Sequence, residues 1–145
     1  MLNKALGLDL GTQTLGIAQS DILGFVHGVE TFRFPKNQYV LARKHVLEIC
    51  EKEGIKEIAL GLPLHQKGYA SEMSNICLKF KEDLLKENPN LVIEMIDERF
   101  TSVMANNTIS ELGLNHQKRK DSVDRIAACY ILDTYVSKKE RLNGK

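Results

Sequence analysis

Three acidic stretches contain the residues best suited to chemistry in this sequence. Asp9 lies inside the first apolar run, Asp97 and Glu98 follow a later apolar run, and Asp124 precedes a run of small and apolar residues. Burying a carboxylate is costly unless its charge is compensated. Clustered carboxylates can all stay ionised if a cation lies between them, and oxygen ligands without His or Cys select Mg²⁺ or Mn²⁺. Two such ions can promote phosphodiester hydrolysis.

Each of these acids also has an ordinary structural explanation. Asp9 could simply form a turn at the end of a strand. Asp97 and Glu98 could cap the helix that follows them, since the helix dipole favours acids there, and Asp121 and Asp124 could do the same for a later helix. Convergence of the acids at one place in the fold would favour catalysis, so the elements that position them matter.

The order of the elements predicts such a convergence. Strands are predicted over residues 5–10, 15–20, 26–34, 57–63 and 91–96, and helices over residues 38–53, 71–87, 101–112 and 122–137. The first three strands have links too short for crossovers and should form an antiparallel meander, whereas the last two follow helices and should add in parallel. We therefore expect an α/β fold with a mixed five-stranded sheet flanked by helices, and a single domain spanning residues 1–145.

In this topology Asp9 and the Asp97–Glu98 pair both lie at the carboxyl ends of strands, where open α/β sheets bind ligands. Asp9 shares its side of the strand with the small residues Ala5 and Gly7, so a group has room to approach. Alternation along the strand does not decide between Asp97 and Glu98.

The last predicted helix should bring Asp124 to the same edge. Asp124 shares a helix face with Ala127, Ala128 and Ile131, at offsets of three, four and seven residues. The two alanines allow the helix to approach the sheet closely. Asp124, one turn earlier, would then lie near the sheet edge.

The net charge of +1 excludes a global field that attracts nucleic acid, so polyanion binding needs a local patch. Lys118, Arg119 and Lys120 form a basic cluster, predicted as a loop, just before Asp124, and Arg99 follows the acids directly. We interpret these four basic residues as phosphate contacts. The alternatives are a solvated charge run for the cluster and a structural ion pair for Arg99.

The three cysteines predict no thiol chemistry. Cys50, Cys77 and Cys129 lack CxxC spacing, and each lies in an apolar helical pattern, so we expect core residues in a reducing cytosol. We recognise neither a signal peptide nor an apolar run long enough to span a membrane, which predicts a cytoplasmic protein.

Four motifs together resemble the YqgF/RuvX family, RNase H-like nucleases described as acting on precursor 16S rRNA or as Holliday-junction resolvases. They are GLDLGTQTLGIAQSD (7–21), GLPLHQKG (61–68), DERFTS (97–102) and DRIAACYIL (124–132). The resemblance covers nearly the whole chain and implies an RNase H-like fold. It also implies that Asp9, Glu98 and Asp124 are the catalytic acids that bind Mg²⁺ or Mn²⁺, two ions in the expected mechanism. Asp97 and Asp121 would be auxiliary, with helix capping the preferred role of Asp121.

The sequence departs from this family at one pair of positions. Members commonly have a basic pair before the Ile-Gly of the first motif, where this chain has Gln13 and Thr14. Phosphate contact would then depend more on Arg99 and on residues 118–120. The change also leaves open a protein that binds nucleic acid without cleaving it.

The expected function is hydrolysis of phosphodiester bonds at the 5′ end of pre-16S rRNA. The alternative within the nuclease class is resolution of four-way DNA junctions, which requires a dimer, so the chain is expected as a monomer or homodimer bound to structured RNA or branched DNA. An alternative of another class is a fragment of an actin-like phosphate-binding ATPase, since DLGT followed by a strand also opens those proteins. Its test is thermal stabilisation by ATP with Mg²⁺.

Overall fold

The computed structural model of this protein describes residues 2–64, 71–98 and 116–143, and within the last range the side chains of residues 123–142. The elements are β1 (Ala5–Leu10), β2 (Thr14–Ser20), β3 (Val26–Arg33), α1 (Tyr39–Glu53), β4 (Glu57–Leu62), α2 (Glu72–Glu87), β5 (Val92–Asp97) and α4 (His116–Asn143). The predicted strands and first two helices agree with these bounds to within a residue or so. The helix predicted over residues 101–112 lies outside the described residues.

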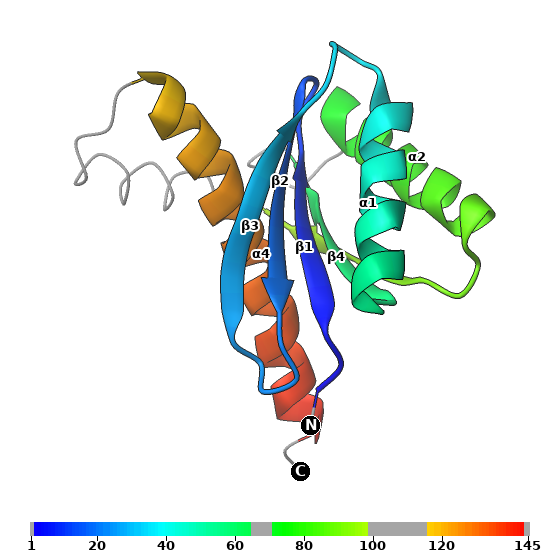
Figure 1. Ribbon diagram of the computed structural model, residues 1–145, viewed down its shortest axis with the longest axis vertical. Helices are drawn as coiled ribbons and strands as arrows, with labels where there is room; N and C mark the ends of the chain where they lie inside the picture. Colours follow the sequence, from blue (N-terminus) through cyan, green and yellow to red (C-terminus); the bar gives the residue numbers. More distant parts are fainter. Residues whose placement is uncertain (1, 65–70, 99–115, 144–145) are drawn as a thin grey trace.

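The five strands form one sheet in the order β3-β2-β1-β4-β5. β1 pairs antiparallel with β2, and β2 with β3, whereas β4 adds parallel to β1 and β5 parallel to β4. The mixed sheet predicted from the link lengths is therefore confirmed. α1 and α2 cover one face, and α4 crosses the other (Figure 1).

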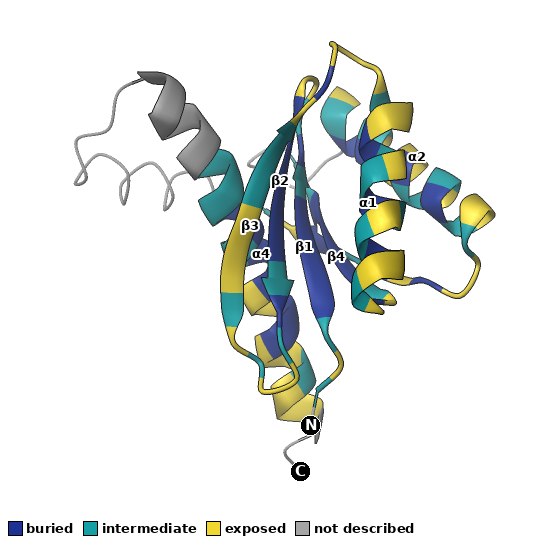
Figure 2. Cartoon of the chain, in the orientation of Figure 1, coloured by how far each residue is buried: buried dark blue, intermediate teal, exposed yellow. Residues whose placement is uncertain are grey.

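The face of the sheet under α1 and α2 is built from large aliphatic side chains. The fully buried residues that the central strands contribute to this core are Leu6, Leu8, Leu15, Ile17, Ile58 and Leu60. α1 and α2 cover them with Val46, Phe80 and Leu84. Figure 2 shows β1, β2 and β4 mostly buried, whereas β3 at the sheet edge is more exposed. This core therefore supplies most of the apolar burial in the described residues.

The face under α4 is built from the smallest residues. They are Ala5 and Gly7 in β1, Gly16 and Ala18 in β2, Gly28 in β3, and Ala59 and Gly61 in β4. A Cβ atom on Gly7 would lie 2.6 Å from the carbonyl oxygen of Ala128, and one on Gly16 would collide with the carbonyl oxygen of Asp124. The helix backbone therefore rests almost directly on the strands. The sequence prediction that Ala127, Ala128 and Ile131 face the sheet is confirmed, because all three are buried.

α4 is longer than the helix predicted from the sequence. It begins at His116 rather than near residue 122 and ends at Asn143 rather than near residue 137. The prediction treated residues 114–120 as a basic loop, but Gln, Lys and Arg have high helix propensity and no Gly or Pro interrupts the run from His116. Residues 118–120 are thus helical. Asp121 and Asp124 lie inside the helix, so the prediction that Asp121 caps its start is wrong.

Local signals set the other helix ends. α1 is followed by Gly54 in the left-handed conformation (φ 68°), whose N–H donates to the carbonyl of Cys50. α2 begins after Ser71, whose side chain accepts from the N–H of Ser74 in a reciprocal capping box. The Ser71 hydroxyl also donates to the carbonyl of Pro63 (2.8 Å), which ties the start of α2 to the end of β4.

The cysteines are core residues, as predicted. Cys50 and Cys77 are buried, Cys129 is half-buried, and all three are free thiols. Burial raises the pKa of Cys50 to about 11 and that of Cys77 to about 12. Protonated thiols at neutral pH are poor nucleophiles. Across the ranges that the structure describes, no helix is both long and apolar enough to cross a membrane.

Candidate active site

Asp9 lies near the carboxyl end of β1, on the face covered by α4. It pairs with Gly16 across the β1–β2 ladder and follows Ala5 and Gly7 on the same face. The carboxyl groups of Asp9 and Glu98 are hydrogen-bonded to each other. The structure therefore brings together two of the three acids that the sequence singled out.

Glu98 reaches Asp9 from β5, two strands away, by passing over β4. Its backbone N–H donates to the carbonyl of Leu62 (3.2 Å), which extends the β4–β5 pairing by one residue. Its Oε2 atom occupies the space in which Gly61 would carry a side chain. The Glu98 carboxylate thus lies over β4 at a position where the strand has no side chain.

The alternation of side chains along β5 places Glu98 and Asp97 on different faces of the sheet. Ile96 packs in the core under α4, and Glu98 has the same parity, whereas Ile93 and Met95 pack in the core under α1 and α2. Asp97 has the parity of these two residues and is exposed. The sequence left this pair ambiguous, and the structure places Glu98, not Asp97, beside Asp9.

The electrostatics of the pair are those of two acids that share one proton. Burial raises the pKa of Asp9 well above its usual range, and the charges of Glu98 and Asp124 raise it further. Burial also raises the pKa of Glu98 to about 7, although its hydrogen bond with Asp9 acts in the opposite direction. In the hydrogen bond between them Asp9 is the donor, because the bond raises the pKa of Asp9 and lowers that of Glu98.

Asp124 contributes from α4. Its backbone carbonyl lies against Gly16, the ladder partner of Asp9, and its Oδ2 atom is buried. Its charge raises the pKa of Asp9. Because α4 begins at His116, Asp124 lies about two turns inside the helix and is not a first-turn acid stabilised by the helix dipole.

The sequence interpretation missed Gly61, Gly16 and Arg125. The stem of Arg125 lies over Gly28 of β3, with its Cγ atom 2.6 Å from the position that a Cβ would take. A signal was available for the glycines, since Gly16 and Gly61 fall within the motif stretches 7–21 and 61–68. Arg125 places a guanidinium group on the same face of the sheet as the acids.

The two positions that depart from the family pattern lie at the turn between β1 and β2. Thr14 is buried, and its carbonyl accepts from the N–H of Gly11 (2.8 Å). Gln13 is exposed, and its carbonyl accepts from the N–H of Phe34 (3.0 Å). Thr14 is therefore packed into the start of β2, and both hydrogen bonds of this turn use backbone carbonyls that any residue would supply.

The predicted phosphate-binding residues are described only in part. Arg99 lies outside the described residues. Lys118, Arg119 and Lys120 belong to the first two turns of α4, with Lys120 one turn before Asp124. Their role in binding phosphate stays a prediction.

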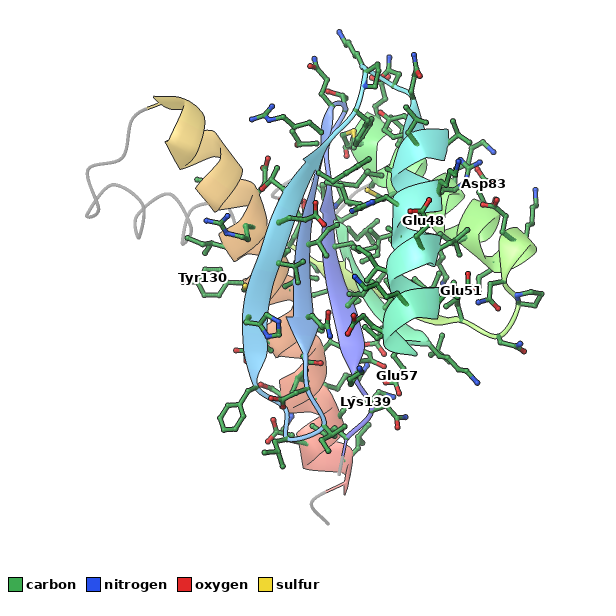
Figure 3. All side chains as sticks on the ribbon, in the orientation of Figure 1. Glu48, Glu51, Glu57, Asp83, Tyr130 and Lys139 are labelled. Carbon is green, nitrogen blue, oxygen red and sulfur yellow. The ribbon has the colours of Figure 1, made fainter. Side chains whose placement is uncertain are left out.

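Glu48, Glu51 and Glu57 do not belong to the candidate site. Glu48 and Glu51 on α1 are exposed. Glu57 is the first residue of β4 and lies near Lys139, at the end of the strand opposite to the candidate site (Figure 3). There Glu57 accepts a hydrogen bond from the hydroxyl of Tyr135 (2.5 Å). This second acidic position is a structural contact between β4 and α4.

The residues at the candidate site fit a divalent cation in type but are not arranged as a finished metal site. In the parts of the chain that the structure describes, no group of three or more His, Cys, Asp or Glu side chains is close enough to hold a metal ion. Asp9 and Glu98 are instead hydrogen-bonded to each other, while the charge of Asp124 raises the pKa of Asp9. Carboxylate oxygens alone are the donor set of hard cations such as Mg²⁺ and Mn²⁺.

Known structures identify the fold. The chain is similar to T. thermophilus RuvC in complex with Holliday junction substrate, with a TM-score of 0.62, 12% identity and 96% of each chain covered. It is similar to a second Thermus thermophilus RuvC structure, with a TM-score of 0.59, 12% identity, and 95% and 96% of the two chains covered. The architecture is therefore the RuvC-like, RNase H-like fold.

The sequence identifies the family. The family model described as "RuvX: Holliday junction resolvase" matches residues 3–138. This chain belongs to the RuvX family. A protein of Clostridium botulinum strain Hall named "Putative pre-16S rRNA nuclease" is 42% identical over 134 residues, which are 92% of this chain and 96% of that protein. Relatives with the same name in Clostridium acetobutylicum and Staphylococcus carnosus are 40% and 33% identical, each over more than 90% of both chains.

Proposed function

We propose that this protein is a metal-dependent nuclease that hydrolyses phosphodiester bonds at the 5′ end of precursor 16S rRNA. The observation that carries the proposal is the contact between the half-buried carboxyls of Asp9 and Glu98, with the charge of Asp124 acting on Asp9. Two findings from the comparisons support the proposal. The chain belongs to the RuvX family, and it is 42% identical to a relative named "Putative pre-16S rRNA nuclease".

The proposed role of the three acids is to hold divalent cations, two in number, with Mg²⁺ or Mn²⁺ as the ion. RNase H-like nucleases typically use divalent metal ions. The electrostatics support this role, because burial raises the pKa values of both Asp9 and Glu98, and a bound cation would stabilise their ionised forms. When bound, such ions activate water and stabilise the attacking and leaving oxygens of a phosphodiester displacement.

The chain itself has three tasks in this mechanism. Asp9 and Glu98 would hold the cation with both carboxyls ionised, a state that a bound cation would favour. The close contact of α4 with Gly16 fixes the height of Asp124 above the sheet. Basic side chains hold the phosphate backbone in register, and for this role we propose Arg99 and residues 118–120, with Arg125 on the same face of the sheet as the acids.

A cleavage assay tests the proposal. The protein is incubated with a precursor 16S rRNA 5′ end and, separately, with a four-way DNA junction, each with Mg²⁺, with Mn²⁺ and with EDTA. We expect metal-dependent cleavage of the RNA. Cleavage of the junction alone would favour the second candidate function, junction resolution, for which the description of the family model is the supporting observation.

The same assay addresses loss of catalysis. Binding of the RNA without cleavage in any metal would contradict the nuclease proposal. It would instead favour a nucleic-acid-binding protein that lost activity together with the basic pair replaced by Gln13 and Thr14.

A further inference from the structure

We propose that Gly61 is a positioning residue for Glu98: the missing side chain at position 61 opens the path across β4 by which the Glu98 carboxylate reaches Asp9. This inference rests on the proposed function insofar as it concerns metal binding. Its structural part concerns only where the Glu98 carboxylate lies, and can be tested separately.

The strand order creates the need for such a path. β4 lies between β1 and β5, so the carboxyls of Asp9 and Glu98 can meet only above β4. Ala59 pairs with Gly7 and packs in the core under α4, and Gly61 has the same parity two residues later. Position 61 is therefore on the face where the two carboxyls meet.

The contacts of Gly61 show how little space remains there. A Cβ atom on Gly61 would collide with Oε2 of Glu98, lie 3.1 Å from Cδ of Glu98 and lie 2.6 Å from Cδ1 of Ile131. Glu98 cannot withdraw as a whole, because its N–H is bonded to the carbonyl of Leu62. An added methyl group would therefore displace the carboxylate, or Ile131, or both.

The backbone gives no other reason for a glycine at this position. Gly54 has a φ of 68°, which side-chain-bearing residues rarely adopt, and nothing lies within 4 Å of its missing Cβ. Gly61 is the opposite case, because its φ is outside the left-handed range and its surroundings are crowded. The glycine is required by the side chain of Glu98 and not by the local conformation of the strand.

The test measures Mn²⁺ binding without substrate, by calorimetry, in the full-length protein and its Gly61→Ala variant. We expect Gly61→Ala to weaken Mn²⁺ binding about tenfold or more, the usual effect of removing support from a metal ligand. Unfolding in urea should remain cooperative. The shorter acid in Gly61→Ala/Glu98→Asp should recover part of the lost affinity, although Glu98→Asp alone binds more weakly than the wild type.

A second double variant separates positioning from core packing. Gly61→Ala/Ile131→Val relieves the contact with Ile131 while keeping the contact with Glu98. We expect it to recover stability but not Mn²⁺ affinity. Recovery of affinity in this variant, or unchanged affinity in Gly61→Ala, would overturn the proposal.

A crystal structure of metal-free Gly61→Ala decides the structural part independently of metal binding. We expect the Glu98 carboxylate to have moved away from Asp9. If the wild type binds no Mn²⁺, the proposed function fails, while this structure still tests the positioning. An unmoved carboxylate would overturn the positioning proposal even if the wild type binds metal and cleaves RNA.

Discussion

The two faces of the sheet use the same strands for different purposes. Toward α1 and α2, alternate residues such as Leu6, Leu8 and Leu60 are large and fully buried. Toward α4, their neighbours Gly7 and Gly61 have no side chain, and the helix backbone or another residue fills the space. The first face gains stability from apolar burial, whereas the second gives up burial to bring chemical groups close together.

The acids of the candidate site lie on the face covered by α4. Asp9, Glu98 and Asp124 all belong to the small-residue face, and their charges act on one another. Asp97, which has the parity of the other face, is exposed and lies outside the contact between Asp9 and Glu98. Removing groups from the two faces should therefore have opposite effects on stability and activity.

The largest contrast is expected between Asp9→Asn and Leu6→Ala. Asp9→Asn should lower cleavage by at least about a thousandfold. It should leave the metal-free protein as stable as the wild type or more stable, because a buried acid surrounded by like charges is removed. Leu6→Ala should lower the free energy of unfolding by about 3 kcal/mol and keep cleavage per folded molecule.

Urea unfolding in EDTA and single-turnover cleavage measure both properties. A loss of several kcal/mol in Asp9→Asn would instead identify Asp9 as a structural hydrogen-bonding residue. The two faces would then not differ as described.

Neighbouring residues on β2 provide the next comparison. Gly16→Ala places a methyl group against the backbone carbonyl of Asp124, which cannot rotate away, so α4 must shift. We expect a loss of about 2 to 3 kcal/mol in unfolding free energy and weaker cleavage, because Asp124 moves. Ile17→Val, on the opposite face, should cost about 1 kcal/mol and leave cleavage unchanged.

Thermal melts and cleavage assays of Gly16→Ala and Ile17→Val distinguish the outcomes. Equal effects of the two substitutions on cleavage would mean that the spacing of α4 from the sheet does not control the site.

The third comparison is the pH dependence of the metal-free protein, which should leave cleavage-independent stability as its only readout. The pKa of Glu98 rises from its ordinary value of 4.5 to about 7 in the folded state. The folded state therefore holds this proton more tightly than the unfolded state. Its contribution to stability is complete below about pH 4.5 and is lost as the pH rises through about 7, by about 2 kcal/mol for a half-buried group.

Urea midpoints in EDTA over this pH range, for the wild type and Glu98→Gln, measure that contribution. The wild type should lose stability relative to Glu98→Gln as the pH rises. A constant difference between the two proteins would show that Glu98 titrates normally and is not held against Asp9.

The sequence predicted the part of this arrangement that depends on alternation and link length. Parity placed Asp9 with Ala5 and Gly7, and the short links required a meander for the first three strands; the structure agrees on both. The helical spacing of Ala127, Ala128 and Ile131 predicted the buried face of α4 correctly, because residues at these offsets lie on one side of a helix.

The remaining features depend on the order of strands in space. Glu98 meets Asp9 by crossing β4, which lies between their strands and has a glycine where the carboxylate crosses. No local pattern around residues 97–98 records this. The predicted start of the last helix was wrong for a different reason. A run of basic residues is compatible with a loop or a helix, and helix propensity favours the helix here.

The most direct test of the account is turnover of Glu98→Gln and Asp97→Asn on a precursor 16S rRNA 5′ end over a Mg²⁺ titration. The two acids are adjacent, but only Glu98 crosses to Asp9. We predict that Glu98→Gln loses metal-dependent cleavage at normal stability. Asp97→Asn should keep measurable turnover and lose about 1 kcal/mol of stability, as expected if Asp97 caps the chain that follows. Wild-type turnover in Glu98→Gln, whether Asp97→Asn is inactive or active, would contradict the account.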